Sequence, residues 1–342
     1  MKILVTGGAG FIGGNFVRLM LSEYADIEII NLDALTYAGN LESLSDLEGN
    51  PRHTFIRGDI ASIEDVEKVF SGHAFDAVIN FAAESHVDRS LHMGVSYFIE
   101  TNIKGTQLLL DAARQHGVPR FVQISTDEVY GSLGPQGRFS ESSPVAPNNP
   151  YAATKAGADF LVRAACRSHK LDAVITRCSN NYGPFQFPEK MIPLMISNIL
   201  EDKPLPVYGD GMQVRDWIYV EDHCRAVDAV LRRGKTGEVY NIGGLYDVPN
   251  IEVVKLLLKL LEKPESLIRY VEDRPGHDRR YAMDAEKIQK ELGWKPRVKF
   301  EEGIRKTIDW YLANREWLSH VRSGNYMAYY DRMYGKRKAA AG

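Results

Sequence analysis

The sequence predicts an α/β protein in which a doubly wound parallel sheet carries a smaller C-terminal substrate-binding lobe. Short apolar runs alternate with stretches of helical periodicity, and a glycine-rich segment follows the first run. Such alternation builds a parallel sheet with helices on both faces. The runs expected to form strands are Ile3–Val5, Ile27–Asn31, Thr54–Arg57, Ala77–Phe81, Phe121–Ser125 and Ala173–Arg177.

The first predicted strand leads into a glycine loop and then an amphipathic helix. Thr6 is followed by GGAGFIGG, in which Gly8, Gly10 and Gly13 satisfy the pattern GxGxxG. Missing side chains let the backbone turn sharply and let a pyrophosphate rest on the helix N-terminus. The pattern alone is often accidental, but its place between strand and helix predicts a Rossmann-type dinucleotide site.

Residues at the ends of the next strands indicate which dinucleotide is bound. Asp33 follows Gly13 by 20 positions, after the second strand. A carboxylate there bonds the adenosine ribose and repels a 2′-phosphate, so NAD is favoured over NADP. The alternative is an aspartate that only caps a turn. Asp59-Ile60 and Ala82-Ala83, after the third and fourth strands, are candidates to contact the cofactor or are simple turns.

A tyrosine and a lysine open the helix expected after the fifth strand. Tyr151 and Lys155 are four residues apart, so both side chains project from one helix face. We expect the lysine charge to lower the pKa of the phenol, which then accepts a proton from an alcohol as hydride leaves. The YxxxK pattern occurs by chance in many helices, but the glycine loop earlier in the chain supports its interpretation as a catalytic pair.

These features together resemble the extended short-chain dehydrogenase/reductase family. The shared motifs are TGGAGFIG at the start, YxxxK near residue 150, and a Ser or Thr after the fifth strand, here Thr126. Within that family, STDEVYG at 125–131 looks like the signature of the dTDP-glucose 4,6-dehydratases, as do AAESHVDRS, NNYGPFQFPEK and RPGHD. The resemblance covers nearly the whole chain. It implies NAD as cofactor and conversion of dTDP-glucose to dTDP-4-keto-6-deoxyglucose and water.

The resemblance assigns Asp127 as the acid and Glu128 as the base of the elimination. Removing water across C5 and C6 of a 4-keto sugar needs both roles, and the two environments must separate the carboxyl pKa values. Adjacent strand residues point to opposite faces, so the chain must leave the sheet near Thr126. Gly131 and Gly134 just beyond permit such a turn. Otherwise the two acids only cap a turn.

The resemblance also implies two sets of binding residues. Those for NAD, besides Tyr151 and Lys155, are Gly7, Gly10, Phe11, Ile12, Gly13, Asp33, Asp59, Ile60, Ala82, Ala83, Thr101 and Asn181. Those for the sugar nucleotide are Ser85, His86, Thr126, Asn180, Glu189, Lys190, Pro206, Tyr208, Arg215, Asn250, Arg274 and His277. Each alone could be an ordinary surface or core residue.

Composition excludes several other classes of protein. A formal charge of −3 gives no general attraction to nucleic acid or to anionic membranes. No stretch approaches the roughly 20 apolar residues of a membrane span, and no signal peptide is evident. The three cysteines form no CxxC pair, and no His/Cys/carboxylate grouping has metal-site spacing. We therefore expect a cytoplasmic enzyme without a metal.

The expected organisation is an NAD-binding domain over residues 1–182 and a mainly substrate-binding lobe over 183–342, with segments interleaved into the first domain. Helices are expected at Ile251–Leu261 and Glu301–Asn314 in the second part. The family usually dimerises through two helices per subunit, here Ser96–His116 and Pro150–His169, although their apolar faces could be ordinary core.

Three alternatives stay open. A sugar-nucleotide 4-epimerase shares the glycine loop and the Tyr151/Lys155 pair but has no need for Asp127 and Glu128. A dehydratase for another nucleotide sugar differs only in pocket shape, and the segment GGLYDVPN before Asn250 departs from the dTDP-glucose pattern. A noncatalytic NAD-sensing protein would retain the fold without the chemistry.

Overall fold

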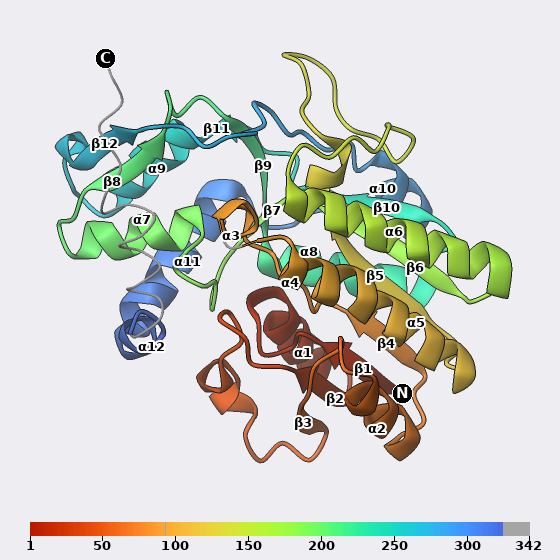
Figure 1. Cartoon of the computed structure of the whole chain (residues 1–342). Helices are drawn as coiled ribbons and strands as arrows, with labels where there is room; N and C mark the ends of the chain where they lie inside the picture. The colour runs from red at the N-terminus through yellow and green to blue at the C-terminus, as the bar shows by residue number, and fades with distance from the viewer. Residues whose placement is uncertain (93, 324–342) are drawn as a thin grey trace.

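The computed structural model describes residues 1–92 and 94–323, and its centre is a seven-stranded parallel sheet (Figure 1). The strand order is β10-β6-β5-β4-β1-β2-β3. β1 lies between β2 and β4, with Val5 opposite Asn31 and Ile79. The strands are β1 Lys2–Thr6, β2 Glu28–Asp33, β3 His53–Arg57, β4 Ala77–Asn80, β5 Phe121–Thr126, β6 Ala173–Cys178 and β10 Val239–Ile242. The predicted fold class is confirmed, and all six predicted strands are present.

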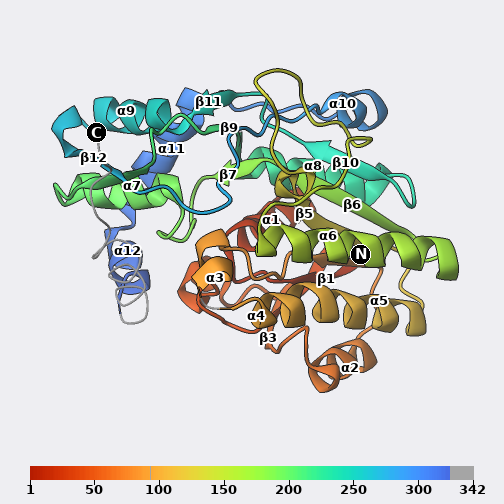
Figure 2. The ribbon, with the colours of Figure 1, turned by 45° about the horizontal axis from the view of Figure 1, so that its top comes forward.

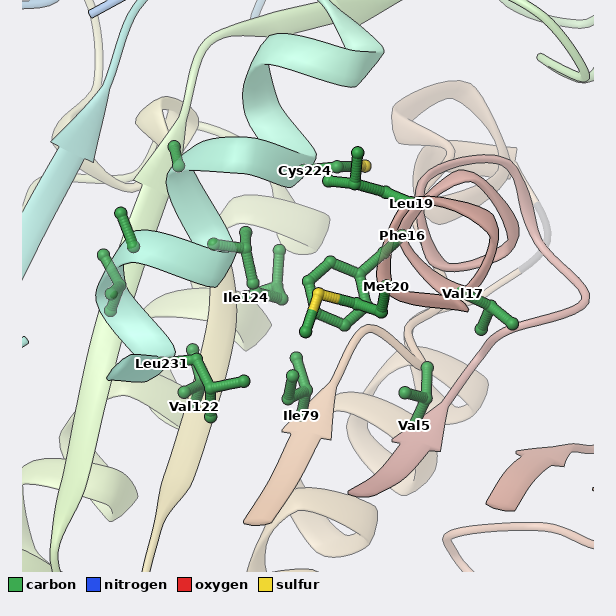
Figure 3. Close-up of a cluster of buried hydrophobic side chains, with 14 of the residues drawn as sticks. Val5, Phe16, Val17, Leu19, Met20, Ile79, Val122, Ile124, Cys224 and Leu231 are labelled. Atoms are coloured by element: carbon green, nitrogen blue, oxygen red, sulfur yellow. The ribbon is translucent and has the colours of Figure 1, made fainter. Parts of the chain in front are cut away.

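Helices cover both faces of this sheet, as the continuous apolar runs of its strands require. One face packs α1 (Phe11–Glu23), α8 (Val220–Arg233) and α10 (Glu286–Leu292). Figure 3 shows Phe16 and Met20 of α1 directed toward Ile79 of the sheet. The other face packs α2 (Ile63–Gly72), α5 (Thr106–Gln115) and α6 (Pro150–His169). Alternate strand residues supply the two cores: Val5 lies in the first and Leu4 in the second.

A third hydrophobic core forms beside the sheet, where Figure 1 shows α7, α9 and α11 together. Its strands form a three-stranded sheet, β11-β9-β7, and the pair β12-β8. These strands are β7 Asn180–Tyr182, β8 Leu205–Tyr208, β9 Val214–Tyr219, β11 Asp247–Pro249 and β12 Ile268–Val271. Its helices are α7 Met191–Leu200, α9 Asn250–Leu260, α11 Phe300–Ala313 and α12 Arg315–Val321. The two helices predicted in this region are confirmed within one residue at each end.

The chain returns to the large sheet after residue 182. Helix α8 packs on α1, and β10 then pairs with β6, placing Tyr240 beside Thr176. The sequence analysis did not predict β10, because four residues with a central asparagine, VYNI, carry little strand signal. The return ties the second half of the chain to the first.

The predicted helix over 96–116 is interrupted. It consists of α4 (Ser96–Phe98), a π-helical segment at Ile99–Gly105, and α5. Asn102 in the π-helical segment donates to Thr154 Oγ1 of α6 at 2.9 Å. Figure 2 shows α5 and α6 side by side, and the short helix α3 (Val87–His92) also contacts α6. Within the described residues, no helix is both long and apolar enough to cross a bilayer.

Candidate active site

Two adjoining cavities lie at the carboxyl ends of the parallel strands. Ligands bind at this edge in open α/β sheets. The first cavity is lined by the glycine loop and the ends of β2, β4 and β5. The second lies between α3 and the elements α7, β8, β9 and α9. Glu128, Asn180 and Lys190 line both cavities. The junction between the cavities is therefore at Glu128, one of the two predicted catalytic acids.

The glycine loop is shaped to receive a phosphate group. Gly7 has a φ of +72°, and a Cβ on Gly13 would lie 2.4 Å from the Gly7 carbonyl oxygen. Helix α1 begins at Phe11, and its N-cap Gly10 makes no side-chain cap. The backbone N–H groups of the first turn are thus available to an anion. All five predicted residues of this loop line the first cavity: Gly7, Gly10, Phe11, Ile12 and Gly13.

Asp33 lines the same cavity and also caps its own loop. Its Oδ2 accepts from Ala9 N at 2.9 Å, and its Oδ1 accepts from Leu35 N at 2.8 Å. Burial raises the pKa of this carboxyl, while the two backbone bonds act against that rise. Each carboxylate oxygen retains a lone pair for a further donor. The two sequence interpretations of Asp33, ligand and cap, are compatible in this geometry.

The other predicted cofactor residues line the first cavity as well. They are Asp59, Ile60, Ala82, Ala83, Thr101 and Asn181. Thr101 comes from the π-helical segment, a type of distortion frequently found at functional sites. Asn181 accepts from His223 Nδ1 through Oδ1 at 2.9 Å. Burial lowers the pKa of His223 to about 3, so the imidazole is neutral. Sequence reasoning missed His223, which lies in helix α8 and outside the recognised motifs.

The backbone leaves the sheet where the two acidic residues require it. Strand β5 ends at Thr126, and a 3-10 turn begins at Asp127 and ends at Tyr130. Thr126 caps this turn by accepting from Glu128 N at 3.2 Å. Gly131 ends the turn with a φ of +81°, and a Cβ there would lie 2.2 Å from Ala146 O. Both carboxyl groups consequently reach the first cavity.

The environments of the two carboxyl groups differ. Asp127 is 2% exposed, and burial, followed by the charges of Glu128 and Asp216, raises the pKa of its carboxyl well above the usual range. Within the described residues, its Oδ2 has no hydrogen-bond partner. Glu128 is only half-buried and accepts from Asn149 Nδ2 through Oε2 at 3.0 Å. Asp127 is therefore suited to donate a proton.

Tyr151 and Lys155 both line the first cavity on α6. Lys155 Nζ donates to Ile124 O at 2.7 Å. Burial raises the pKa of the Tyr151 phenol well above its usual range, and the charge of Glu128 adds to the rise. The expectation that Lys155 lowers this pKa is wrong for this arrangement. Desolvation of the phenol dominates, and burial also lowers the pKa of the lysine itself.

All twelve residues predicted to bind the sugar nucleotide line one or both cavities. Ser85 and Thr126 line the first, and Asn180 and Lys190 line both. The second is lined by His86, Glu189, Pro206, Tyr208, Arg215, Asn250, Arg274 and His277. This set combines a tyrosine ring, two guanidinium groups, one ammonium group, two imidazoles, two amides and one carboxyl group. The composition suits a nucleoside diphosphate, which presents a planar base and a dianionic linker.

The cationic groups of the second cavity are held by fixed partners. Arg215 is 5% exposed and donates to Val214 O at 2.8 Å and to Asp278 O at 2.9 Å. Lys190 Nζ donates to Ser85 O at 2.8 Å. Burial lowers the pKa of both cationic groups. Cations desolvated in this way gain from an anionic ligand.

Several lining residues were not predicted. Thr36 and Gly39, after β2, and Phe187, before α7, line the first cavity. Asp88 lines the second and lies within the quoted segment AAESHVDRS, so its motif was a signal that sequence reasoning left unused. No group of three or more His, Cys, Asp or Glu in residues 1–92 and 94–323 is arranged to hold a metal ion.

A phosphate-binding glycine loop, a carboxylate at the end of β2 and a buried YxxxK pair at the edge of a parallel sheet define a site of the short-chain dehydrogenase/reductase type. The chain belongs to the GDP-mannose 4,6 dehydratase family, whose model matches residues 4–307.

Individual relatives are similar over nearly the whole chain. A dTDP-glucose 4,6-dehydratase of Xanthomonas campestris pv. campestris strain B100 is 54% identical over 94% of this chain and 96% of its own. The structure of the dTDP-glucose 4,6-dehydratase DesIV from Streptomyces venezuelae, with NAD bound, has a TM-score of 0.91 and 50% identity over 94% of this chain and all of its own. The Bacillus anthracis str. Ames enzyme, in complex with NAD, has a TM-score of 0.88 and 48% identity over 94% of this chain and 99% of its own. The resemblance found in the sequence is confirmed.

Proposed function

We propose that this chain is an NAD-dependent dTDP-glucose 4,6-dehydratase, producing dTDP-4-keto-6-deoxyglucose and water. The observation that carries the proposal is Glu128 at the junction of the two cavities, beside a shielded Asp127. This pair distinguishes a dehydratase from a 4-epimerase, which needs no elimination. The relatives of about 50% identity that carry this name support the same choice.

The first cavity suits NAD. The glycine loop has no room for side chains where the pyrophosphate would rest, and Asp33 offers lone pairs to ribose hydroxyls. NAD, when bound, supplies the hydride acceptor and donor, and its oxidised nicotinamide ring adds a positive charge. The remaining steps depend on the side chains of this chain.

Tyr151 is assigned the proton of the sugar O4 hydroxyl, with Thr126 beside it on the cavity wall. The resulting 4-ketone makes the C5 proton acidic. Glu128 removes that proton, and Asp127 donates its own proton to O6 as the C6–O6 bond breaks and water leaves. To give the 6-deoxy product, the hydride taken from C4 would have to be delivered to C6, and Glu128 would return the proton to C5. The raised pKa of Asp127 keeps it protonated for this step, whereas the half-buried Glu128 is the acceptor.

We assign the second cavity to the nucleotide half of the substrate and the junction to the hexose. Accordingly, we assign residues 1–182 to the main NAD-binding domain and 183–342 mainly to the substrate-binding lobe, although β10 returns to the large sheet; residues 324–342 of this range lie outside the described residues. His86, which is 5% exposed, lines the second cavity, and we assign it to the wall next to the hexose position.

We also propose a homodimer formed through α4, α5 and α6. Tyr97 is 70% exposed and Phe160 is 53% exposed, although both are large apolar side chains. Tyr97 lies on α4 and Phe160 on α6, and the π-helical segment that follows α4 contacts α6 through the buried hydrogen bond from Asn102 to Thr154. Burial of this face in a second copy would remove apolar surface from water. A cytoplasmic location is supported by the free thiols of Cys166, Cys178 and Cys224.

The test is incubation of the purified protein with dTDP-glucose, without added NAD, followed by mass spectrometry of the product. We expect loss of one water from dTDP-glucose and much slower reaction of UDP-glucose. An epimerised sugar of unchanged mass would identify a 4-epimerase instead. Equal rates on both nucleotides would refute the nucleotide assignment but retain the dehydratase chemistry.

A further inference from the structure

Asp88 is a buried acid in the wall of the cavity assigned to an anionic ligand. It is 2% exposed and lies in the short helix α3, two residues after His86. It lines the second cavity together with Arg215 and Arg274. A carboxylate in this place repels a diphosphate unless groups of the protein itself neutralise its charge. The contacts of Asp88 provide such groups.

Both carboxylate oxygens of Asp88 bind side chains that also line the cavity. Arg274 Nη1 donates to Oδ1 at 3.1 Å, and the Tyr208 hydroxyl donates to Oδ2 at 2.9 Å. Tyr208 ends β8, and Arg274 follows β12, the strand that pairs with β8. Asp88 thus joins α3 to both strands of this pair. Its buried charge is balanced by one cation and one neutral donor.

The pairing leaves part of the guanidinium available. Arg274 Nε is buried and has no hydrogen-bond partner among the described residues. A buried N–H group without a partner is costly and is commonly satisfied by a ligand. Because Asp88 holds the Nη1 edge, the orientation of the Nε edge is fixed before a ligand arrives. Preorganised donors bind an anion with less entropic cost than free side chains do.

We infer that Asp88 is a positioning residue for the nucleotide site: it orients Arg274 toward the diphosphate of the substrate. The inference rests on the proposed function. It predicts that removing the Asp88 charge weakens nucleotide binding, although a negative charge near the diphosphate has been removed. If Asp88 acted only by repelling the diphosphate, removal of its charge would instead make nucleotide binding tighter.

The experiment is a double-mutant cycle with Asp88→Asn, Arg274→Ala and the combined variant, using dTDP binding by calorimetry. We expect Asp88→Asn to bind dTDP roughly tenfold more weakly, as for loss of one charge-assisted contact. In the Arg274→Ala background, Asp88→Asn should have no further effect. With dTDP-glucose, KM should rise about as much while kcat stays within roughly twofold. Asp210→Asn, which breaks the exposed pair with Arg279 at 2.8 Å, is the matched control and should bind normally.

Unchanged or tighter binding by Asp88→Asn, or an equal loss in both backgrounds, would overturn the inference. A fall in kcat and NAD content with unchanged dTDP binding would also overturn it, because that is a general structural effect. If Asp88→Asn does not fold, Tyr208→Phe replaces it in the cycle, since it removes one bond to Asp88 and keeps the ring. Failure of the unaltered protein to bind dTDP would overturn the substrate assignment itself, and this inference with it.

Discussion

Glu128→Gln tests the proposed base directly. Glu128 lies at the junction of the two cavities, and among the described residues no other carboxyl group lines both of them. Glutamine has nearly the same shape but does not accept a proton from carbon at neutral pH. We expect oxidation at C4 to proceed and elimination to stop. The variant should therefore accumulate the reduced cofactor and release very little product.

The expected size follows from what the side chain does in the structure. A positioned general base contributes about 10² to 10⁴ in rate, which corresponds to about 3 to 5 kcal/mol of barrier. The stability cost is small, because the glutamine carbonyl can still accept from Asn149 Nδ2, now 3.0 Å from Glu128 Oε2. We expect less than about 1 kcal/mol in the free energy of unfolding. A loss of activity in Glu128→Gln would therefore report the missing base and not a loss of folded protein.

The assay follows two signals in one reaction with dTDP-glucose. Mass spectrometry measures loss of water, and cofactor fluorescence measures accumulation of NADH on the protein. Glu141→Gln is the control: Glu141 is also half-buried and accepts one bond, from Asn241 N at 2.9 Å, but lines neither cavity. It should retain the activity of the unaltered protein.

A Glu128→Gln variant that keeps more than about one tenth of kcat would refute the base assignment, because a residual rate of that size requires another acceptor. Loss of both signals together would place the defect before elimination, at binding or at C4 oxidation. Only loss of product with retained NADH formation agrees with the geometry.

Three further predictions follow from single buried groups. Tyr151→Phe should lower kcat by about 10² to 10⁴ and slow NADH formation by a similar factor, with NAD content unchanged in the purified protein. Asp33→Ser should raise affinity for NADP relative to NAD by at least roughly tenfold in fluorescence titrations, since the charge facing a 2′-phosphate is removed; an unchanged ratio would leave Asp33 only its capping role. Burial raises the pKa of Asp216 from 3.8 to about 6. The neutral form is thus favoured in the fold, and this contribution to stability, about 3 kcal/mol, is present below pH 3.8 and lost as pH rises through about 6. The free energy of unfolding, measured with urea, should therefore fall as the pH rises from 3.8 to about 6, and this part of the pH dependence should be absent in Asp216→Asn. The same pH dependence in both proteins would contradict the prediction.

The sheet and the cofactor cavity could be predicted because their signals are local. A glycine loop between strand and helix has one common geometry, and buried strands are continuous apolar runs. The six predicted strands and the cavity-lining positions of Gly7, Gly13 and Asp33 follow from such patterns. The residues of the second cavity could be predicted only from the resemblance to a family, because they are far apart in the sequence and only the family motifs group them.

Features that depend on tertiary contacts could not be predicted. Strand β10 is defined by its partner β6 rather than by its own four residues. His223 supports Asn181 from a helix in the second half of the chain. Asp88 gains its significance only when Arg274, 186 residues later, is placed against it. A sequence pattern specifies which side chains are present, but the fold determines which of them meet.

The pKa of Tyr151 is another property that the sequence does not predict, because it depends on the folded surroundings of the phenol. Four-residue spacing predicts that Lys155 and Tyr151 share a helix face, and they do line one cavity. It does not predict the balance between desolvation and charge at the phenol. Here burial and the nearby Glu128 favour the neutral phenol. Glu128 therefore has a second effect besides its proposed role as base: its negative charge opposes deprotonation of Tyr151. Glu128→Gln should then ease proton transfer to Tyr151, which is a further reason to expect NADH to accumulate rather than disappear in that variant.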